Sequence, residues 1–105
     1  MSRLLDLPSP PDAVICGDNI ISIGAMKAIK ERNLSIPQDI GLISFDNYPI
    51  AELVEPTLTT VDVDVYELGA EAAKLMIKLI ENPSARHQCS LISTTIHIRG
   101  STGKR

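Results

Sequence analysis

The feature that most constrains the fold is a regular alternation between short apolar runs and segments with helical periodicity. The runs typical of buried strands lie at residues 12–17, 40–45, 58–61 and 91–100. The segments with helical spacing lie at residues 20–32, 48–56 and 65–81. Consecutive strands that are joined by helices usually pair in parallel. The sequence therefore predicts an α/β fold in which helices flank a parallel sheet.

Polar residues mark the expected ends of the two longer helices. Asp18 and Asn19 precede the first of them and offer side-chain oxygens to its free amides, and we expect Asn19 to be its cap. The same helix should end near Asn33, which tolerates a left-handed backbone. Asp64 followed by Glu67 resembles a capping box at the start of the long helix.

The composition excludes several classes of function. The chain has 105 residues and a formal net charge of −3, which argues against binding nucleic acid or an anionic membrane by itself. No apolar run of about 18 residues and no export signal is visible, so a cytoplasmic location is expected. Cys16 and Cys89 form no CxxC unit, and Cys16 is expected to be a buried free thiol. We expect no metal site and no cofactor.

The first helix has an apolar surface on its predicted solvent side. Lys27 and Lys30 mark that side, yet Ile20 and Ile23 project onto it as well. Each branched side chain left in water forgoes about 1.5–3 kcal/mol of burial. Either a loop of the same chain or a subunit interface should cover them.

The remaining apolar residues of both helices are predicted to face the core. In the first helix this set comprises Ile21, Ala25, Met26, Ala28 and Ile29. In the long helix it comprises Val65, Leu68, Ala72, Leu75, Met76, Leu79 and Ile80, and we expect this face to pack on a sheet.

Several short motifs occur in a specific order along the chain. They are Pro-Asp-Ala at 11–13, Ile-Pro-Gln-Asp at 36–39, Phe-Asp-Asn at 45–47, Leu-Thr-Thr-Val at 58–61 and Arg-Gly-Ser-Thr at 99–102. Over about residues 5–102 this ordered set resembles the effector-binding core of LacI/GalR-family transcriptional regulators. The resemblance implies a type I periplasmic-binding-protein-like fold, with two α/β lobes around a small-molecule cleft.

The resemblance also implies how the chain is divided, and that it is the C-terminal part of the effector-binding domain. The implied segments are a linker or helix end at 1–10, part of the C-terminal lobe at 11–56, a crossover and helix of the N-terminal lobe at 57–83, return strands at 84–102 and a tail at 103–105. Such a fragment would sense a sugar-like effector and form a homodimer. It would reach operator DNA only through a headpiece that these residues do not contain.

Two aspartates follow predicted strands and are the candidate effector ligands. In open parallel sheets, ligands bind beyond the carboxyl ends of the strands, and Asp18 and Asp46 lie there. An ionised carboxylate accepts hydrogen bonds from sugar hydroxyls or the N–H edge of a base. In the family, the aspartate at the Asp46 position commonly reaches the effector, and the polar residue at the Asp18 position often does so. Alternatively, Asp46 ends its strand in an Asx-turn with Asn47, and Asp18 is only a helix cap.

The sequence departs from the family pattern at one point. Family members usually have a small polar residue followed by Asp, whereas this chain has Asp18 followed by Asn19. The extra carboxylate changes the charge of the pocket, so an effector cannot be assigned by analogy.

The resemblance also identifies candidate interface residues. Ile23 corresponds to a position in the dimer interface of the family, and Leu53 and Val54 are weaker candidates for the same surface. Tyr48 would either stack on a ligand ring or pack at the dimer face.

Two other functional classes remain as alternatives. A solute-binding protein of a sugar transporter shares this fold. An enzyme could use Asp18 or Asp46 as an acid or base, but the sequence contains no Ser-His-Asp order, P-loop or GxGxxG motif. We therefore expect no catalytic residues.

Overall fold

The structure is a computed structural model that describes residues 1–84 and 89–103. Residues 85–88 of the predicted return segment and the last two residues of the predicted tail lie outside the described residues. The chain forms two compact units. Unit 1 comprises Met1–Asp62 and the segment from Ile96 onward, and unit 2 comprises Val63–Thr95.

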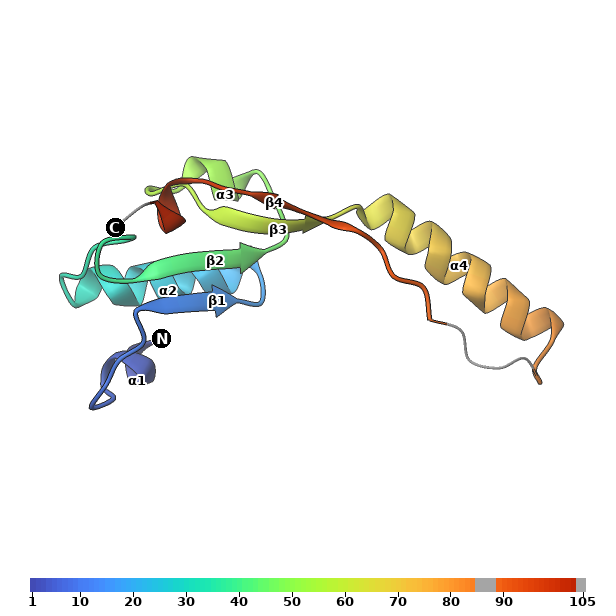
Figure 1. Cartoon of the computed structure of the whole chain (residues 1–105), viewed down its shortest axis with the longest axis horizontal. Helices are drawn as coiled ribbons and strands as arrows, with labels where there is room; N and C mark the ends of the chain where they lie inside the picture. Colours follow the sequence, from blue (N-terminus) through green and yellow to red (C-terminus); the bar gives the residue numbers. More distant parts are fainter. Residues whose placement is uncertain (85–88, 104–105) are drawn as a thin grey trace. The chain divides into compact units, whose positions relative to one another are not determined.

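The strands and helices follow the predicted α/β order. In chain order they are α1 (Ser2–Leu5), β1 (Ala13–Cys16), α2 (Asn19–Glu31), β2 (Gly41–Phe45), α3 (Ile50–Leu53), β3 (Thr59–Val63), α4 (Val65–Glu81), β4 (Thr94–His97) and the 3-10 helix η1 (Gly100–Thr102). The four strands form one sheet in the order β1-β2-β3-β4 (Figure 1). Both β1–β2 and β2–β3 pair in parallel. The strand β4 runs back along the sheet, so the sheet is mixed but mostly parallel (Figure 1). The predicted fold class is confirmed.

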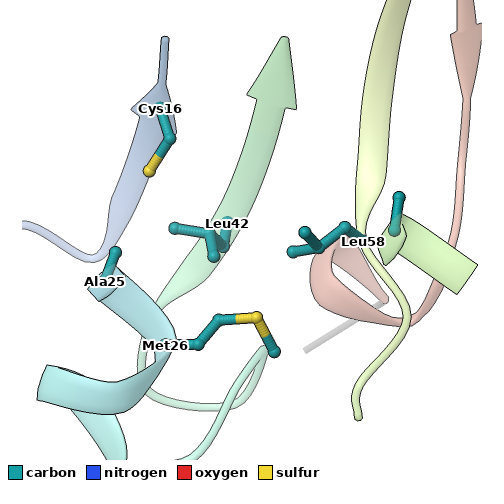
Figure 2. Close-up of a cluster of buried hydrophobic side chains, with 6 residues drawn as sticks. Cys16, Ala25, Met26, Leu42 and Leu58 are labelled. Atoms are coloured by element: carbon teal, nitrogen blue, oxygen red, sulfur yellow. The ribbon is translucent and has the colours of Figure 1, made fainter. Parts of the chain in front are cut away.

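The core of unit 1 lies between α2 and the sheet. Side chains from β1, α2, β2, α3 and the residue before β3 form one apolar cluster: Cys16, Ala25, Met26, Leu42, Ala51 and Leu58 (Figure 2). Leu42 and Leu58 are fully buried. Cys16 is buried and carries a free thiol, as predicted.

Local capping signals explain where the helices begin and end. The Oδ1 atom of Asp64 accepts hydrogen bonds from the amides of Tyr66 and Glu67, at 2.9 and 3.0 Å, as the sequence predicts. Asn33 follows α2 with a left-handed φ of 56°. Near the same helix end, Arg32 forms a 2.7 Å ion pair with Asp6, and its hydrogen bond lowers the pKa of that carboxyl.

One predicted core residue of α2 is not in the core. Ala25, Met26 and Ile29 are buried as predicted, but the side chain of Ile21 is 56% exposed. Ile21 lines an open groove beside β1, which is an edge strand of the sheet. The prediction that Ile21 faces the core was wrong. In the first turn of α2 the polar residues Asn19 and Ser22 are the buried ones, and Ile21 lies on the exposed side.

The long helix α4 differs from its predicted packing. It spans Val65–Glu81 and is amphipathic, and Glu71 pairs with Lys74 at 2.6 Å. The hydrogen bond from Lys74 lowers the pKa of the Glu71 carboxyl. None of the residues of α4 is buried, because unit 2 contains only this helix and its flanking segments. Within the described residues, no helix has the length and apolarity needed to cross a membrane.

The position of Leu58 yields a test of the core. Leu58→Ala should lower the free energy of unfolding by about 2–5 kcal/mol, because it removes a fully buried side chain from the cluster. Urea denaturation followed by circular dichroism measures this change. Leu91→Ala is the control, since the Leu91 side chain is 92% exposed and its loss should change stability by less than about 0.5 kcal/mol. Equal effects of both substitutions would contradict the assignment of the core.

Candidate functional site

The parallel pairing of β1 and β2 brings the two candidate aspartates to one edge of the sheet. Cys16 is paired with Ser44 at the ends of these strands. Asp18 and Asp46 each lie two residues beyond this pair, so both follow the carboxyl ends of neighbouring parallel strands. Both residues are half-buried. This is the place at which open α/β sheets bind ligands.

Asp18 is the cap of α2. Its Oδ1 atom accepts a 2.7 Å hydrogen bond from the backbone amide of Ile21. The prediction that Asn19 is the cap was therefore wrong, because Asn19 is already the first residue of the helix and is fully buried. A cap occupies the position before the helix, where its oxygen can reach the amides of the first turn.

Asn19 instead joins the start of α2 to the end of β2. Its Nδ2 atom donates to the hydroxyl of Ser44 at 2.7 Å and to the carbonyls of Phe45 and Asp46 at 2.9 and 2.8 Å. Carbonyl oxygens only accept hydrogen bonds, so these contacts need the amide donor of Asn19, which the aspartate usual at this position in the family would lack. This role of Asn19 was not predicted from the sequence, although the Asp-Asn order was the available signal.

One atom of Asn19 has no partner. In residues 1–84 and 89–103, its Oδ1 is the only buried side-chain nitrogen or oxygen that lacks a hydrogen bond. The neighbouring Nδ2 atom is engaged with acceptors, so the amide cannot rotate to exchange the two atoms. Asn19 thus fixes the loop through its donor side and leaves an acceptor unused.

Asp46 has an unusual backbone and a free carboxylate. Its φ angle is 64°, in the left-handed region that Asp tolerates better than most residues. Its amide donates to the carbonyl of Val61 at 3.0 Å, and its own carbonyl is held by Asn19. Across the described part of the chain, the Asp46 side chain makes no hydrogen bond, so the predicted alternative of an Asx-turn is not observed. Its oxygens are therefore available to another molecule.

The residue after Asp46 belongs to a closed ring of hydrogen bonds. The Thr60 hydroxyl and Arg99 Nη2 both donate to Asn47 Oδ1 at 2.9 Å. Arg99 Nη1 also donates to the Thr60 hydroxyl at 3.1 Å, which closes the ring. The hydrogen-bonded ring of Asn47, Thr60 and Arg99 was not predicted from the sequence. Arg99 lies in the Arg-Gly-Ser-Thr motif, but no periodicity connects it with Asn47.

The guanidinium of Arg99 is largely buried and fully engaged at its two Nη atoms. The side chain is only 15% exposed. Besides its partners in the ring, it donates to the carbonyl of Leu58 and to Glu52 Oε1, both at 2.8 Å. A buried cation is tolerated when hydrogen bonds and a counter-charge replace its lost hydration, and Arg99 has both.

The predicted interface residues divide into two kinds. Ile20 and Leu53 are 75% and 77% exposed, respectively. Ile23 and Val54 are partly buried and line a groove of about 440 Å³ between α2 and the end of α3. Tyr48, in the loop after β2, is 57% exposed. The predicted loop cover over Ile20 is therefore not present in the described residues.

Comparison with known proteins identifies the relatives of this chain. A family model described as a periplasmic binding protein-like domain matches residues 1–102. The HTH-type transcriptional repressor CytR of Escherichia coli K12 is 36% identical over 102 residues, which cover 97% of this chain. This chain spans 30% of the length of that repressor.

Two solved structures that resemble this chain are also of transcriptional regulators. A putative transcriptional regulator LacI from Bacillus cereus subsp. cytotoxis superimposes with a TM-score of 0.83 and 32% identity, over 97% of this chain and 36% of that chain. A LacI family transcriptional regulator from Enterococcus faecium with bound ribose superimposes with a TM-score of 0.71 and 29% identity, over 96% of this chain and 37% of that one. The arrangement of strands and helices described above is therefore shared with these regulators.

The contacts of Asn19 yield a test of the site. Asn19→Asp should lower the free energy of unfolding by about 1–3 kcal/mol, because a carboxylate would face the carbonyls of Phe45 and Asp46 without a proton to donate. Thermal or urea unfolding at pH 7 measures the loss. Asp18→Asn is the control, since it retains a side-chain oxygen for the amide of Ile21 and should change stability little. A neutral effect of Asn19→Asp would show that this amide does not hold the loop.

Proposed function

The chain belongs to the periplasmic binding protein-like domain family, and from this premise we propose that it is the C-terminal part of the effector-sensing core of a LacI-type transcriptional regulator. In this proposal, residues 11–56 belong to the C-terminal lobe, 57–83 cross to the N-terminal lobe, and 84–102 return. The division into units after Asp62 and before Ile96 supports such crossings, although the two divisions fall about 6 and 12 residues after the predicted boundaries at 57 and 84.

The main observation behind the proposal is that the Asp46 carboxylate has no hydrogen-bond partner among the described residues. It lies at the carboxyl edge of a parallel sheet, on a backbone fixed by Asn19 and Val61, and the described residues offer it no hydrogen bond. A carboxylate held in this way can accept two hydrogen bonds from the vicinal hydroxyls of a sugar. Asp18 would add a second acceptor, because its capping bond occupies only Oδ1. Tyr48 would supply an exposed ring beside them.

The effector class follows from this chemistry. Two carboxylates at one edge favour a neutral or cationic ligand that is rich in O–H or N–H donors and disfavour an anionic one. The ribose bound to the Enterococcus faecium regulator is a ligand of this kind. We therefore propose a sugar or a sugar-containing metabolite as the effector.

Regulation would depend on the two lobes. An effector shifts a conformational equilibrium only if it binds one arrangement more tightly than the other. In the intact regulator this difference would alter the affinity of a DNA-binding headpiece for its operator. The chain itself carries a net charge of −3 and would contribute no DNA contact.

The alternative functions have less support. A solute-binding protein of a transporter is not favoured, because the similar proteins are transcriptional repressors. They are regulators and not enzymes, which agrees with the expected lack of catalytic residues.

Effector binding can be tested on the chain itself. Binding by this chain alone should be weak, because in the proposal half of the cleft wall belongs to residues that it does not contain. D-ribose, cellobiose and a nucleoside should therefore each be titrated to high concentration against ¹⁵N-labelled protein, and at least one should shift the amide resonances of residues 18–21 and 46–48. Asp46→Ala should weaken that binding about tenfold or more, since a hydrogen bond to a charged group contributes about 1.5–3 kcal/mol. Asp39→Ala is the control, because the Asp39 carboxylate lies outside the proposed site and accepts a hydrogen bond from the backbone amide of Ser35. Shifts that map only to other residues, or binding unaffected by Asp46→Ala, would contradict the proposed site.

The second part of the proposal is a homodimer formed through α2 and α3. Ile20 and Leu53 are exposed, and Ile23 and Val54 line the groove between these helices. Lys27, Lys30 and Glu31 at its border would form the polar rim that interfaces usually have.

Sedimentation tests this interface. Ile20→Glu should weaken self-association at least tenfold, because it places a charge where an apolar contact is expected. Its fold should be unchanged, since the side chain is already exposed. Ile98→Glu is the matched control, because Ile98 is 79% exposed but outside the proposed surface. A wild-type chain that remains monomeric at all concentrations would contradict this proposal.

A further inference from the structure

The side chain of Arg99 connects the loop after β2 with α3, through hydrogen bonds to Asn47 and Glu52. We propose that Arg99 is a positioning residue that couples the loop at residues 46–48 to α3, so that a change in one is transmitted to the other. This inference rests on the proposed function for its biological meaning, because α3 carries Leu53 and Val54 of the proposed subunit surface. Its physical content concerns only contacts within unit 1.

The loop at residues 46–48 is attached to the rest of unit 1 through the side chain of Asn47. Asn47 Oδ1 accepts hydrogen bonds from Thr60 and Arg99, both at 2.9 Å. Thr60 is fully buried in β3, so one of these partners is fixed by the sheet. Because Asn47 directly follows Asp46, holding its side chain limits the movement of the Asp46 backbone. The loop is therefore anchored by Asn19 on one side and by Arg99 with Thr60 on the other.

The helix α3 is attached through its backbone and through the side chain of Glu52. This helix has only four residues, and its N-cap residue Pro49 forms no side-chain capping bond. Its backbone is tied to the residue before β3 by the hydrogen bond from the amide of Leu58 to the carbonyl of Ala51. Within the described residues, the only side-chain hydrogen bond or ion pair between this helix and the C-terminal segment is the 2.8 Å ion pair between Glu52 and Arg99. The Glu52 side chain is 66% exposed, so in isolation this pair would contribute little to stability.

The geometry of the guanidinium lets Arg99 contact the loop and α3 at the same time. Arg99 Nη2 donates to Asn47 and to Glu52, so one nitrogen atom contacts both the loop and α3. Nη1 donates to the Leu58 carbonyl and the Thr60 hydroxyl, which hold the guanidinium plane against β3. Since the group is rigid and planar, a displacement of Asn47 changes the position available to Glu52. A lysine ammonium has three donors and no fixed plane, and could not serve these four acceptors at once.

The consequence is a direct route from the proposed effector site to the proposed subunit surface. An effector that draws the Asp46 carboxylate toward itself would alter the Asn47–Arg99 bond and, through Nη2, the position of α3. Coupling of this kind is energetic and reciprocal, so a change made at α3 must also appear in the loop. That reciprocity allows a test without any effector.

The test is amide hydrogen exchange of this chain, followed by two-dimensional NMR, in Glu52→Gln. The substitution replaces the carboxylate by a weaker acceptor at an exposed position, and the fold should be retained. If Arg99 couples α3 to the loop, exchange at the Asp46 amide should accelerate about three- to tenfold. The Gly41 amide, which donates to the Asp12 carbonyl, is the internal reference for global stability and should not change. Glu55→Gln is the matched control, with the same change of charge just after α3.

A double-mutant cycle shows whether the effect passes through Arg99. In an Arg99→Gln background, Glu52→Gln should cause no further change at Asp46, because the connection is already absent. Compared with Arg99→Gln, Arg99→Lys should restore only part of the protection of the Asp46 amide against hydrogen exchange. Should Arg99→Gln fail to fold, the same cycle in the Arg99→Lys background should show a reduced effect of Glu52→Gln.

Two results would overturn the coupling role. One is an unchanged Asp46 exchange rate in Glu52→Gln, and the other is an equal effect of Glu52→Gln with and without Arg99. Neither result bears on whether Asp46 binds an effector, which the ligand titration decides separately. Conversely, a chain that binds no sugar could still show the coupling.

Discussion

The parallel pairing of β1 with β2 is the constraint on which the rest of the site depends. It places Cys16 opposite Ser44, so the segments after both strands emerge at the same edge of the sheet. A single-residue shift in this register would turn the Leu42 side chain out of the core, because successive side chains point to opposite faces. Burial of Leu42 against Met26 and Leu58 therefore also fixes where Asp18 and Asp46 lie (Figure 2).

The parts of the structure that could be predicted are those encoded by neighbouring residues. The cap at Asp64, the left-handed residue Asn33 and the starts of β1, β2 and β3 to within one residue follow from local patterns, and the structure has them. The last strand is shorter than the predicted run at 91–100 and begins only at Thr94. The positions of Asp18 and Asp46 at the carboxyl edge follow from strand order together with parallel pairing. The roles of these aspartates in binding, and of Tyr48 beside them, remain predictions that the experiments above address.

The parts that could not be predicted depend on residues far apart in the chain. Asn47 and Arg99 are separated by 52 positions, and Arg99 and Glu52 by 47. No periodicity marks such partners, because their contact arises only once β3 and the C-terminal segment lie side by side. The prediction that Ile21 lies in the core was wrong for a related reason. Helical spacing identifies an apolar face, but only the tertiary structure shows that Ile21 lies beside β1, an edge strand.

The order of Asp18 and Asn19 has a consequence that the family comparison alone does not reveal. The first position of α2 is fully buried and faces two carbonyl oxygens, where an amide donates and a carboxylate would be repelled. The position before it is half-buried, and there a carboxylate can cap the helix with one oxygen and direct the other outward. The arrangement therefore keeps negative charge out of the interior and adds it to the edge that carries Asp46. At the proposed effector site, a ligand that is rich in hydrogen-bond donors would gain from both carboxylates, whereas an anionic ligand would be repelled by both.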